Sequence, residues 1–186
     1  MSQEERTTIV SEAGVRRSLA RMARQIVELN DGTENLVLLG IQRRGKEIGE
    51  RIQEEIRQAE GADVLTGSID ITLYRDDLMT VGPKPVVGES QLPLAGIDDL
   101  RVVVVDDVLF TGRTIRAALN ELMDWGRPAR VDLCVLVDRG GRELPIQPDI
   151  VGRRYPVGAN QQVDVRVPEL DGRLAVELVT HSPEEA

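Results

Sequence analysis

Three short apolar runs constrain the fold of this chain more than any other feature of its sequence. They cover residues 36–39, 101–106 and 131–137, and the first two are each followed by a loop and then by apolar residues at helical spacing. Strands that are apolar along their length and alternate with helices are typical of a parallel sheet buried on both faces. The sequence therefore predicts an α/β fold, in which a mostly parallel sheet has helices packed on each side.

Helices are expected before and after these runs. The first covers residues 11–30 and stops at an Asn-Asp-Gly turn, and the second follows a loop at residues 40–45. A third covers residues 113–123. The last two helices each follow a strand and a loop, which is the unit from which parallel sheets are built.

The remaining segments are shorter or more polar. Residues 66–74 alternate well enough for a further strand, whereas residues 76–91 are polar and contain several glycines and prolines, which indicates a mobile loop. The part of the chain at about residues 146–180 consists of short segments such as 163–167 and 174–179. We expect it to contribute to a small hood subdomain over the strand ends.

Length and composition limit the class of protein. At 186 residues the chain suits one domain, expected to span residues 1–186. Its apolar runs fall far short of the about 20 residues that cross a bilayer, its first residues lack a secretory signal, and Cys134 has no partner for a disulfide. We therefore expect a cytoplasmic protein that makes no contact with membranes.

Charge and histidine content limit the kinds of site. The formal net charge is -9, which argues against indiscriminate attraction to nucleic acid, because phosphate backbones favour basic chains. Any contact with RNA therefore needs a local basic patch. His181 is the only histidine, which argues against a Ser-His-Asp triad and against a histidine-rich metal site.

The most specific motif joins the second apolar run to the helix that follows it. It reads Val102-Val103-Val104-Val105-Asp106-Asp107-Val108-Leu109-Phe110-Thr111-Gly112-Arg113-Thr114. Gly112 permits close approach to the backbone, the helix supplies unpaired N–H groups, and Thr111 and Thr114 add hydroxyl donors, so the turn can cradle a phosphate. Asp106 and Asp107 would repel that phosphate from inside the cradle, and are better placed beside ribose hydroxyls or a hydrated Mg²⁺.

Parts of this motif also occur in unrelated structures. A pair of acids after a strand is found in phospho-acceptor domains and metal sites, and a well-capped helix needs neither the paired acids nor the second threonine. The string lacks the signatures of a P-loop and of a dinucleotide fold. At every position it resembles the motif by which type I phosphoribosyltransferases bind 5-phosphoribosyl 1-diphosphate (PRPP). The resemblance implies that fold, with residues 103–114 binding PRPP and the nucleotide.

Three further stretches resemble one branch of that superfamily, the PyrR-type pyrimidine operon regulators. They are Leu39-Gly40-Ile41-Gln42-Arg43-Arg44-Gly45, Asp70-Ile71-Thr72-Leu73-Tyr74-Arg75-Asp76-Asp77-Leu78 and Val135-Leu136-Val137-Asp138-Arg139-Gly140. The likeness covers about residues 11–149. Members of this branch bind pyrimidine operon mRNA in a UMP-dependent way and commonly keep uracil phosphoribosyltransferase activity. The resemblance implies a homo-oligomer with PRPP, uracil, UMP and the mRNA leader as partners.

The likeness also implies roles for single residues. Arg43, Arg44 and Gly45 would form the diphosphate loop. Tyr74 and Arg75 would anchor the mobile catalytic loop, and Val137, Asp138 and Arg139 would flank uracil. The expected catalytic side chains are Arg44, Tyr74, Arg75, Asp106 and Asp107. For the two neighbouring arginines, a solvated surface pair remains the alternative, since exposed arginines are common.

The implied reaction suits a chain without a nucleophilic triad. PRPP carries its own leaving group, so catalysis needs positioning and charge neutralisation rather than a protein nucleophile. Mg²⁺ is the expected cofactor, held mainly by PRPP, with Asp106 and Asp107 as protein ligands. Mg²⁺ and Arg44 would stabilise the departing diphosphate while the acids support the ribose, and loop closure would exclude water. The products would be UMP and diphosphate.

The first predicted helix indicates a second function, RNA binding. At about 100° per residue, Arg17, Arg21 and Arg24 share one face, opposite the apolar stripe. Arg142 and Arg153 are expected to extend this basic face. The alternative is an ordinary solvated helix face, because amphipathic helices expose arginine routinely.

The sequence departs from the PyrR pattern at positions where RNA binding would be affected. Gly141 stands where the family usually has histidine, Gln147 replaces a basic residue, and residues 152–158 differ from the usual Gly-Lys-Asn-Ile-Pro-Thr-Ser segment. A phosphoribosyltransferase without RNA regulation is therefore the main alternative. A purine in place of uracil is a further one, because base contacts in this class are largely made by the backbone.

Overall fold

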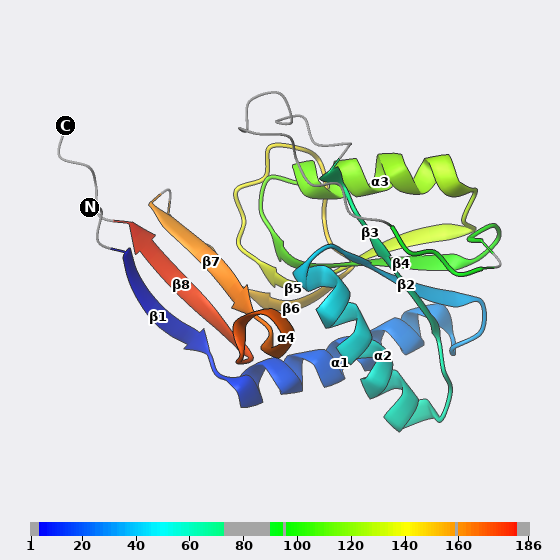
Figure 1. Ribbon diagram of the computed structural model, residues 1–186, viewed down its shortest axis with the longest axis horizontal. Coiled ribbons are helices and arrows are strands. Elements are labelled where there is room, and N and C mark those ends of the chain that lie inside the picture. The colour runs from blue at the N-terminus through cyan, green and yellow to red at the C-terminus, as the bar shows by residue number, and fades with distance from the viewer. Residues whose placement is uncertain (1–3, 73–89, 95, 159, 182–186) are drawn as a thin grey trace.

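Two β-sheets organise the part of the chain that the computed structural model describes, residues 4–72, 90–94, 96–158 and 160–181. The elements are β1 (Glu4–Val10), α1 (Glu12–Asn30), β2 (Leu36–Ile41), α2 (Arg44–Glu60), β3 (Leu65–Ile69), β4 (Arg101–Leu109), α3 (Arg113–Trp125), β5 (Arg130–Asp138), β6 (Ile150–Arg154), β7 (Gln161–Arg166), α4 (Pro168–Asp171) and β8 (Ala175–His181). Five strands form a parallel sheet in the order β3-β2-β4-β5-β6, and three form an antiparallel sheet in the order β1-β8-β7. Figure 1 shows α1 and α2 on one face of the larger sheet and α3 on the other. The predicted α/β architecture with a small hood is confirmed.

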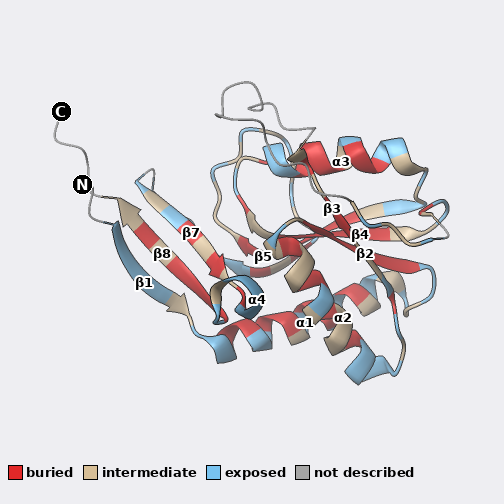
Figure 2. Cartoon of the chain, in the orientation of Figure 1, coloured by how far each residue is buried: buried red, intermediate tan, exposed pale blue. Residues whose placement is uncertain are grey.

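The alternation of side chains along β4 explains why helices cover both faces of the larger sheet. Successive strand residues point to opposite faces. Val103 and Val105 therefore pack in one cluster with α1 and α2, while Val102 and Val104 pack in another with α3. All four valines are buried, and Figure 2 shows buried residues along the central strands of the larger sheet. A strand covered on both faces has no polar side, which is why it appears in the sequence as an unbroken apolar run.

The first helix begins and ends as its sequence predicts. α1 follows Ser11, whose side chain accepts a hydrogen bond from the Gly14 amide, and the chain leaves the helix through Asp31 in the left-handed conformation. The buried residues of α1, including Val15 and Met22, lie along one stripe. Within the described ranges, no helix is both long and apolar enough to cross a membrane.

The connection between β2 and α2 is shorter than predicted. β2 continues to Ile41 and α2 begins at Arg44, so the loop expected over residues 40–45 is reduced to a turn at Gln42 and Arg43. The Gln42 amide donates to a carbonyl of β3 at 2.8 Å. Pairing with the neighbouring strand thus extends β2 beyond its apolar run.

The strand β3 ends earlier than predicted, at Ile69. Asp70 then turns the chain, because its carboxylate accepts a hydrogen bond from the Thr72 amide at 2.9 Å. The end of the predicted strand and most of the predicted mobile loop lie outside the described residues. Tyr74 and Arg75, the expected anchors of that loop, lie outside them as well, and their role stays a prediction.

The hood combines both ends of the described chain. β1, which the sequence does not predict, pairs antiparallel with β8 from Glu4↔His181 to Val10↔Val176. Most side chains of β1 are exposed, so its sequence lacks the apolar alternation that marks a half-buried strand. β6, by contrast, pairs with β5 in the parallel sheet. Only the later part of the segment predicted to form the hood therefore belongs to it.

Candidate active site

Asp106 and Asp107 lie within β4 rather than after it. The strand runs to Leu109 because it keeps pairing with β5 as far as Leu109↔Asp138. The predicted strand end at residue 106 is therefore wrong, and the loop that follows is reduced to residues 110–112. Both carboxylates stand near the carboxyl end of a central parallel strand, the edge at which ligands bind in open α/β sheets.

Burial dominates the electrostatics of this acidic pair. Asp106 is 5% exposed, and burial, followed by the charge of Asp107, raises its pKa well above the ordinary value. Burial also raises the pKa of Asp107, against hydrogen bonds and the positive charge of Arg44, which lower it. Asp106 Oδ1 accepts a hydrogen bond from the backbone amide of Asp107 at 2.9 Å, and Asp107 Oδ1 accepts one from the backbone amide of Val108 at 2.8 Å. A cation at the other oxygens would favour the charged forms.

The same carboxylates fit a magnesium ion that arrives with a substrate. In the described part of the chain, no group of three or more His, Cys, Asp and Glu side chains could hold a metal. Mg²⁺ does not need such a group, since it is usually bound through one or two protein carboxylates together with substrate phosphates and waters. Asp106 and Asp107 provide two hard oxygen donors of that kind.

A glycine-based turn leads from β4 into α3. Gly112, the N-cap residue of α3, has a φ of 93°, a left-handed conformation that favours glycine. A Cβ at this position would lie 3.3 Å from the Ile146 side chain. The backbone conformation and the neighbouring side chain therefore favour glycine here, whether or not a phosphate binds. Thr111 Oγ1 accepts a hydrogen bond from the Arg113 amide at 3.2 Å. Thr114 is exposed in the first turn of the helix.

The loop between β5 and β6 is hydrogen-bonded to this turn. The Glu143 and Leu144 amides donate to the Thr111 carbonyl at 3.0 and 3.1 Å. Arg142 donates to the Phe110 carbonyl at 3.0 Å. The loop runs on the α3 side of the sheet, away from α1 (Figure 1). The structure therefore places Arg142 beside the turn at residues 110–112 and does not bring it together with the arginines of α1.

The residues expected to flank uracil gather near Phe110. The Arg139 guanidinium lies 3.9 Å from the Phe110 ring centroid. Burial lowers the pKa of Arg139, and among the described residues its Nε has no hydrogen-bond partner. Val137 is buried, and Asp138 forms an ion pair with Arg142 at 2.8 Å. A flat cationic and aromatic pair next to a buried strand end suits contact with a planar base.

Gly141 gives a physical reason for one departure from the family pattern. It has a φ of 73°, and a Cβ there would lie 2.5 Å from Cε2 of Phe110. Any larger residue, including histidine, would force the Phe110 ring to move. Glycine lets the ring approach the β5–β6 loop and lie against Arg139.

The expected diphosphate loop lies directly beside the acids. A Cβ on Gly45 would lie 2.6 Å from the Val105 carbonyl oxygen and 3.2 Å from Cα of Asp106, so glycine lets α2 begin this close to β4. The peptide bond that precedes Arg43 is cis. Arg43 is exposed, whereas Arg44 is half-buried. Of the two arginines, Arg44 is thus the one whose side chain packs against the rest of the protein.

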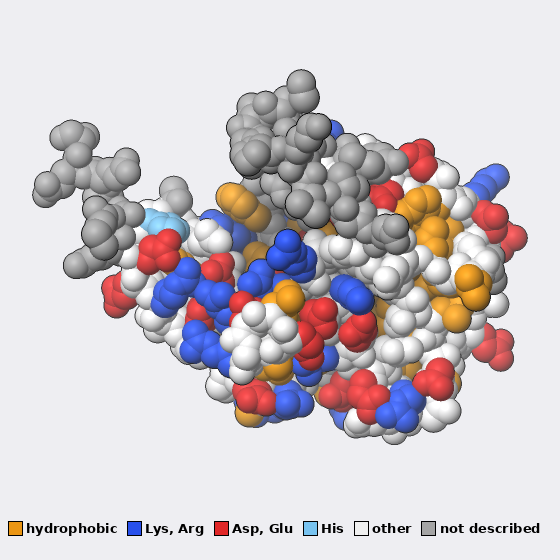
Figure 3. Space-filling view, in the orientation of Figure 1, with side chains coloured by type: hydrophobic (Ala, Val, Ile, Leu, Met, Phe, Trp, Pro, Cys, Tyr) orange, Lys and Arg blue, Asp and Glu red, His pale blue; other side chains and the backbone are white. Residues whose placement is uncertain are grey.

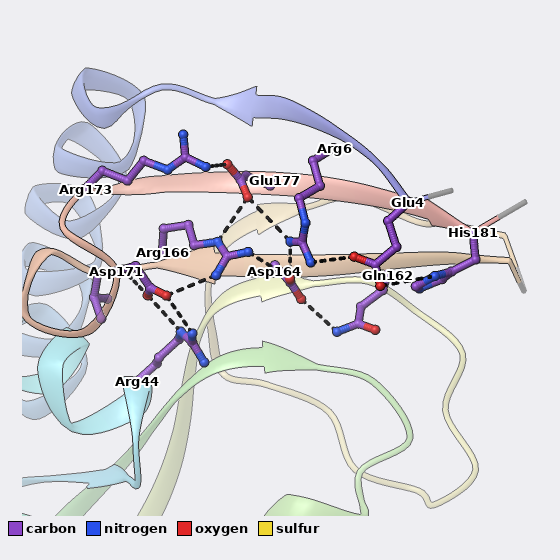
Figure 4. Close-up of polar contacts among 11 residues, drawn as sticks. Glu4, Arg6, Arg44, Gln162, Asp164, Arg166, Asp171, Arg173, Glu177 and His181 are labelled. Atoms are coloured by element: carbon purple, nitrogen blue, oxygen red, sulfur yellow. Dashed lines mark hydrogen bonds and ion pairs between the residues drawn. The ribbon is translucent and has the colours of Figure 1, made fainter. Parts of the chain in front are cut away.

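Arg44 has a partner that the sequence does not reveal. Its Nε and Nη2 donate to the two carboxylate oxygens of Asp171 at 3.2 and 2.9 Å (Figure 4). Asp171 ends α4, a one-turn helix that starts at Pro168 and is capped by Gly172. Proline at the start and glycine after the end are signals for such a helix. No local signal links it to a residue 127 positions away.

Opposite charges are interleaved around this contact. Figure 3 shows Lys and Arg side chains beside Asp and Glu on the face between the hood and the larger sheet. Burial alone would raise the pKa of Asp171, but hydrogen bonds from Arg44, the Val167 amide and Arg166 lower it to about 2. The Asp171 carboxylate is therefore charged at neutral pH and holds Arg44 as an ion pair.

Comparison with known proteins identifies the family. Residues 6–167 match the family model described as phosphoribosyl transferase domain. A curated relative named bifunctional protein PyrR, from Pelotomaculum thermopropionicum, is 49% identical over 175 residues, which cover 94% of this chain and 96% of the relative. Another of that name, from Thermus aquaticus, is 52% identical over 164 residues, covering 88% and 90%. The chain belongs to the PyrR family of phosphoribosyltransferases.

The PyrR-family chain shares its fold with more distant solved structures. The hypoxanthine phosphoribosyltransferase of Trypanosoma cruzi gives a TM-score of 0.71 at 18% identity, covering 95% of this chain and 97% of that chain. A hypoxanthine-guanine phosphoribosyltransferase from Bacillus anthracis gives 0.69 at 18% identity, covering 92% and 96%. The type I phosphoribosyltransferase fold and the PyrR family, both predicted from the motifs, are confirmed.

The basic face of this PyrR-family chain lies on α1. Arg17, Arg21 and Arg24 are all exposed. Arg21 also donates to the carbonyl of Val151 at 3.2 Å and to that of Gly152, which binds its guanidinium to β6. Arg21 is therefore a structural contact between α1 and the sheet edge as well as part of the basic face.

One further arginine joins this face, and acids limit it. Arg153 in β6 donates from Nε to Oγ of Ser18 in α1 at 3.3 Å. At the other end, Arg24 lines a groove between α1 and α2 together with Glu55 and Glu60. These carboxylates offset the positive potential there. The structure thus brings Arg153 to the α1 face, as predicted, and bounds that face with acids that the sequence pattern does not locate.

Proposed function

We propose that this protein transfers the 5-phosphoribosyl group of PRPP to uracil, forming UMP and diphosphate. The observation that carries the proposal is the meeting of Asp106 and Asp107, the Gly112 turn and Arg44 at one edge of the parallel sheet. PRPP contains a ribose, whose hydroxyls can bind acids, and a 5-phosphate, which can bind at a helix start. Its diphosphate can bind a cation. Membership of the family supports the same reaction.

Each part of the site would serve one group of PRPP. The turn at residues 110–112 holds the 5-phosphate, Arg44 faces the diphosphate, and the two aspartates lie beside the ribose, whose C1 becomes positive as its bond to diphosphate breaks. Mg²⁺ bound with PRPP would neutralise charge on the leaving diphosphate. Because PRPP brings its own leaving group, positioning and charge neutralisation are sufficient.

The base would lie beside the end of β5. Val137, Asp138 and Arg139 surround the position, and the contact between Arg139 and Phe110 supports a planar ligand. As the bond between C1 and the diphosphate oxygen breaks, a uracil ring nitrogen forms the new bond to C1 and releases its proton to solvent. The choice of uracil over a purine is supported by the PyrR likeness of residues 135–140.

An assay that compares four bases as substrates tests the transferase proposal. The protein is incubated with PRPP, Mg²⁺ and each of four radiolabelled bases: uracil, hypoxanthine, guanine and adenine. We expect UMP to form faster than any purine nucleotide, and no product when Mg²⁺ is removed. A purine nucleotide formed faster than UMP would overturn the choice of base. The absence of every nucleotide product would overturn the transferase itself.

RNA regulation is the second proposed function. Within the described ranges the side chains of Arg17 and Arg24 make no hydrogen bond or ion pair, so their charges are available to RNA phosphates. Arg153, which touches α1, is in register with Val137 at the base site. This direct pairing of β5 with β6 offers a route by which bound UMP could act on the basic face.

A further inference from the structure

Two ion pairs join the hood helix α4 to α2. Arg44 pairs with Asp171, and Arg51 pairs with Glu169. At about 3.6 residues per turn, the two arginines stand two turns apart on one face of α2. Only the first pair reaches the active site, because Arg44 is the first residue of α2 and the next residue, Gly45, lies against Val105 and Asp106 of β4.

Asp171 is a fixed acceptor. Its side chain is 10% exposed, against 34% for Arg44. Besides Arg44, it accepts hydrogen bonds from the Val167 amide at 3.0 Å and from Nη1 of Arg166 at 3.0 Å. Arg166 in turn pairs with the buried Glu177 at 3.0 Å (Figure 4). Contacts within the hood therefore hold the Asp171 carboxylate independently of Arg44.

We propose that Asp171 is a positioning residue, which holds the Arg44 guanidinium in the orientation that receives the diphosphate of PRPP. This inference rests on the proposed transferase function. Two-point contact with a carboxylate fixes the plane of a guanidinium, and Nε and Nη2 are the atoms that Asp171 uses. A guanidinium has five N–H donors, so donors on Arg44 remain for a second anion.

The physical benefit is a smaller entropy loss on binding. A free arginine side chain samples many rotamers, and a phosphate must order it at an entropic cost, whereas a side chain already held by Asp171 is ordered beforehand. The hood would then contribute to substrate binding through its contact with α2, without touching PRPP. Asp171 carries this effect, and Glu169 does not, because its partner Arg51 lies two turns away from the site.

The variant Asp171→Asn tests the proposal, with Glu169→Gln as the matched control. Asparagine has nearly the same size but presents an N–H donor to the donors of Arg44. We expect KM for PRPP, and the dissociation constant for inorganic diphosphate with Mg²⁺ measured by calorimetry, to rise about tenfold in Asp171→Asn. We expect kcat and KM for uracil to change by less than about twofold. Glu169→Gln, which removes the other ion pair, should leave all four quantities near the wild-type values.

A double-mutant cycle separates positioning from general damage. If Asp171 acts through Arg44, adding Asp171→Asn to Arg44→Ala should have no further effect on diphosphate affinity. Arg44→Lys provides a test that leaves the hood intact, since lysine keeps the charge and loses the two-point contact; it should weaken diphosphate binding about as much as Asp171→Asn. Urea unfolding identifies any variant that does not fold. If Asp171→Asn does not fold, the diphosphate affinity of Arg44→Lys tests the proposal instead.

Three results would overturn the inference. They are unchanged diphosphate affinity in both Asp171→Asn and Arg44→Lys, equal losses in Asp171→Asn and Glu169→Gln, and tighter diphosphate binding in Asp171→Asn, which would mean that the carboxylate competes with the ligand. Each of these presupposes an active wild-type protein. If the wild type forms no UMP, the proposed function fails instead, so the two failures are distinguishable.

Discussion

At the scale of single residues, two glycines with similar backbone conformations allow the proposed role of the turn at residues 110–112 in substrate binding to be separated from its effect on stability. Gly112 has a φ of 93° and lies against Ile146, whereas Gly61 has a φ of 68° at the end of α2 with no neighbour within 4 Å. Alanine at either position should lower the free energy of unfolding by about 1–2 kcal/mol, because left-handed backbone disfavours side chains. Only Gly112→Ala should also raise KM for PRPP, by about tenfold, because it reshapes the turn.

Urea unfolding and steady-state kinetics measure the two effects separately. Equal KM values for PRPP in both glycine variants would show that the turn does not hold the substrate.

A second pair of glycines tests the base site. Gly140 and Gly141 share a φ of 73°, but only a Cβ on Gly141 meets Phe110. Gly141→Ala should move the ring from Arg139 and raise KM for uracil by about two- to fivefold, the size expected for a lost cation–π contact. Gly140→Ala imposes the same backbone strain and should leave KM for uracil unchanged. The same KM in both variants would separate Phe110 from base binding.

At the scale of elements, α1 is expected to carry the contact with RNA. Replacing Arg17 and Arg24 together by glutamate places acid against phosphate, so binding of a pyrimidine leader RNA should weaken for every sequence and its salt dependence should flatten. Arg21 is spared because it is bonded to β6. Gel-shift titrations with and without UMP measure the effect, and UMP should strengthen binding by the wild type.

The matched control replaces Arg57 and Arg127 by glutamate. The net charge then changes equally, while both sites are exposed on α2 and after α3. RNA binding should be retained. A similar loss in both double variants would point to overall charge rather than to the α1 face, and failure of the wild type to bind RNA would favour an enzyme without regulation.

At the scale of the whole molecule, the ion pairs of the hood make stability depend on pH. Asp171 has a pKa of about 2 against an ordinary value of 3.8. A carboxylate with a lowered pKa stabilises the fold fully above its ordinary value, and this stabilisation is lost as the pH falls towards the lowered one. Its size is roughly 2 kcal/mol. Urea unfolding should show the wild type losing its advantage over Asp171→Asn between about pH 4 and pH 2; a constant difference across that range would contradict the assignment.

By itself the sequence determined those features whose physical cause is local. Apolar residues at strand or helical spacing place β2, β4, β5, α1 and α3, because burial on one or both faces requires those spacings. The PRPP motif was also readable, since its acids, its glycine turn and its helix start are contiguous in the chain. The PyrR family followed from three other contiguous stretches, residues 39–45, 70–78 and 135–140.

Only the tertiary structure decided the features that depend on partners distant in the chain. β4 extends past Asp106 because β5 pairs with it, and β1 exists as a strand because β8 lies beside it. Arg142 and Arg153 were predicted for one basic face, yet hydrogen bonds place the first at the turn of residues 110–112 and the second on α1. The partner of Arg44 lies 127 positions away. No local pattern encodes such contacts, because strand register and ion-pair geometry are set by the packing of whole elements.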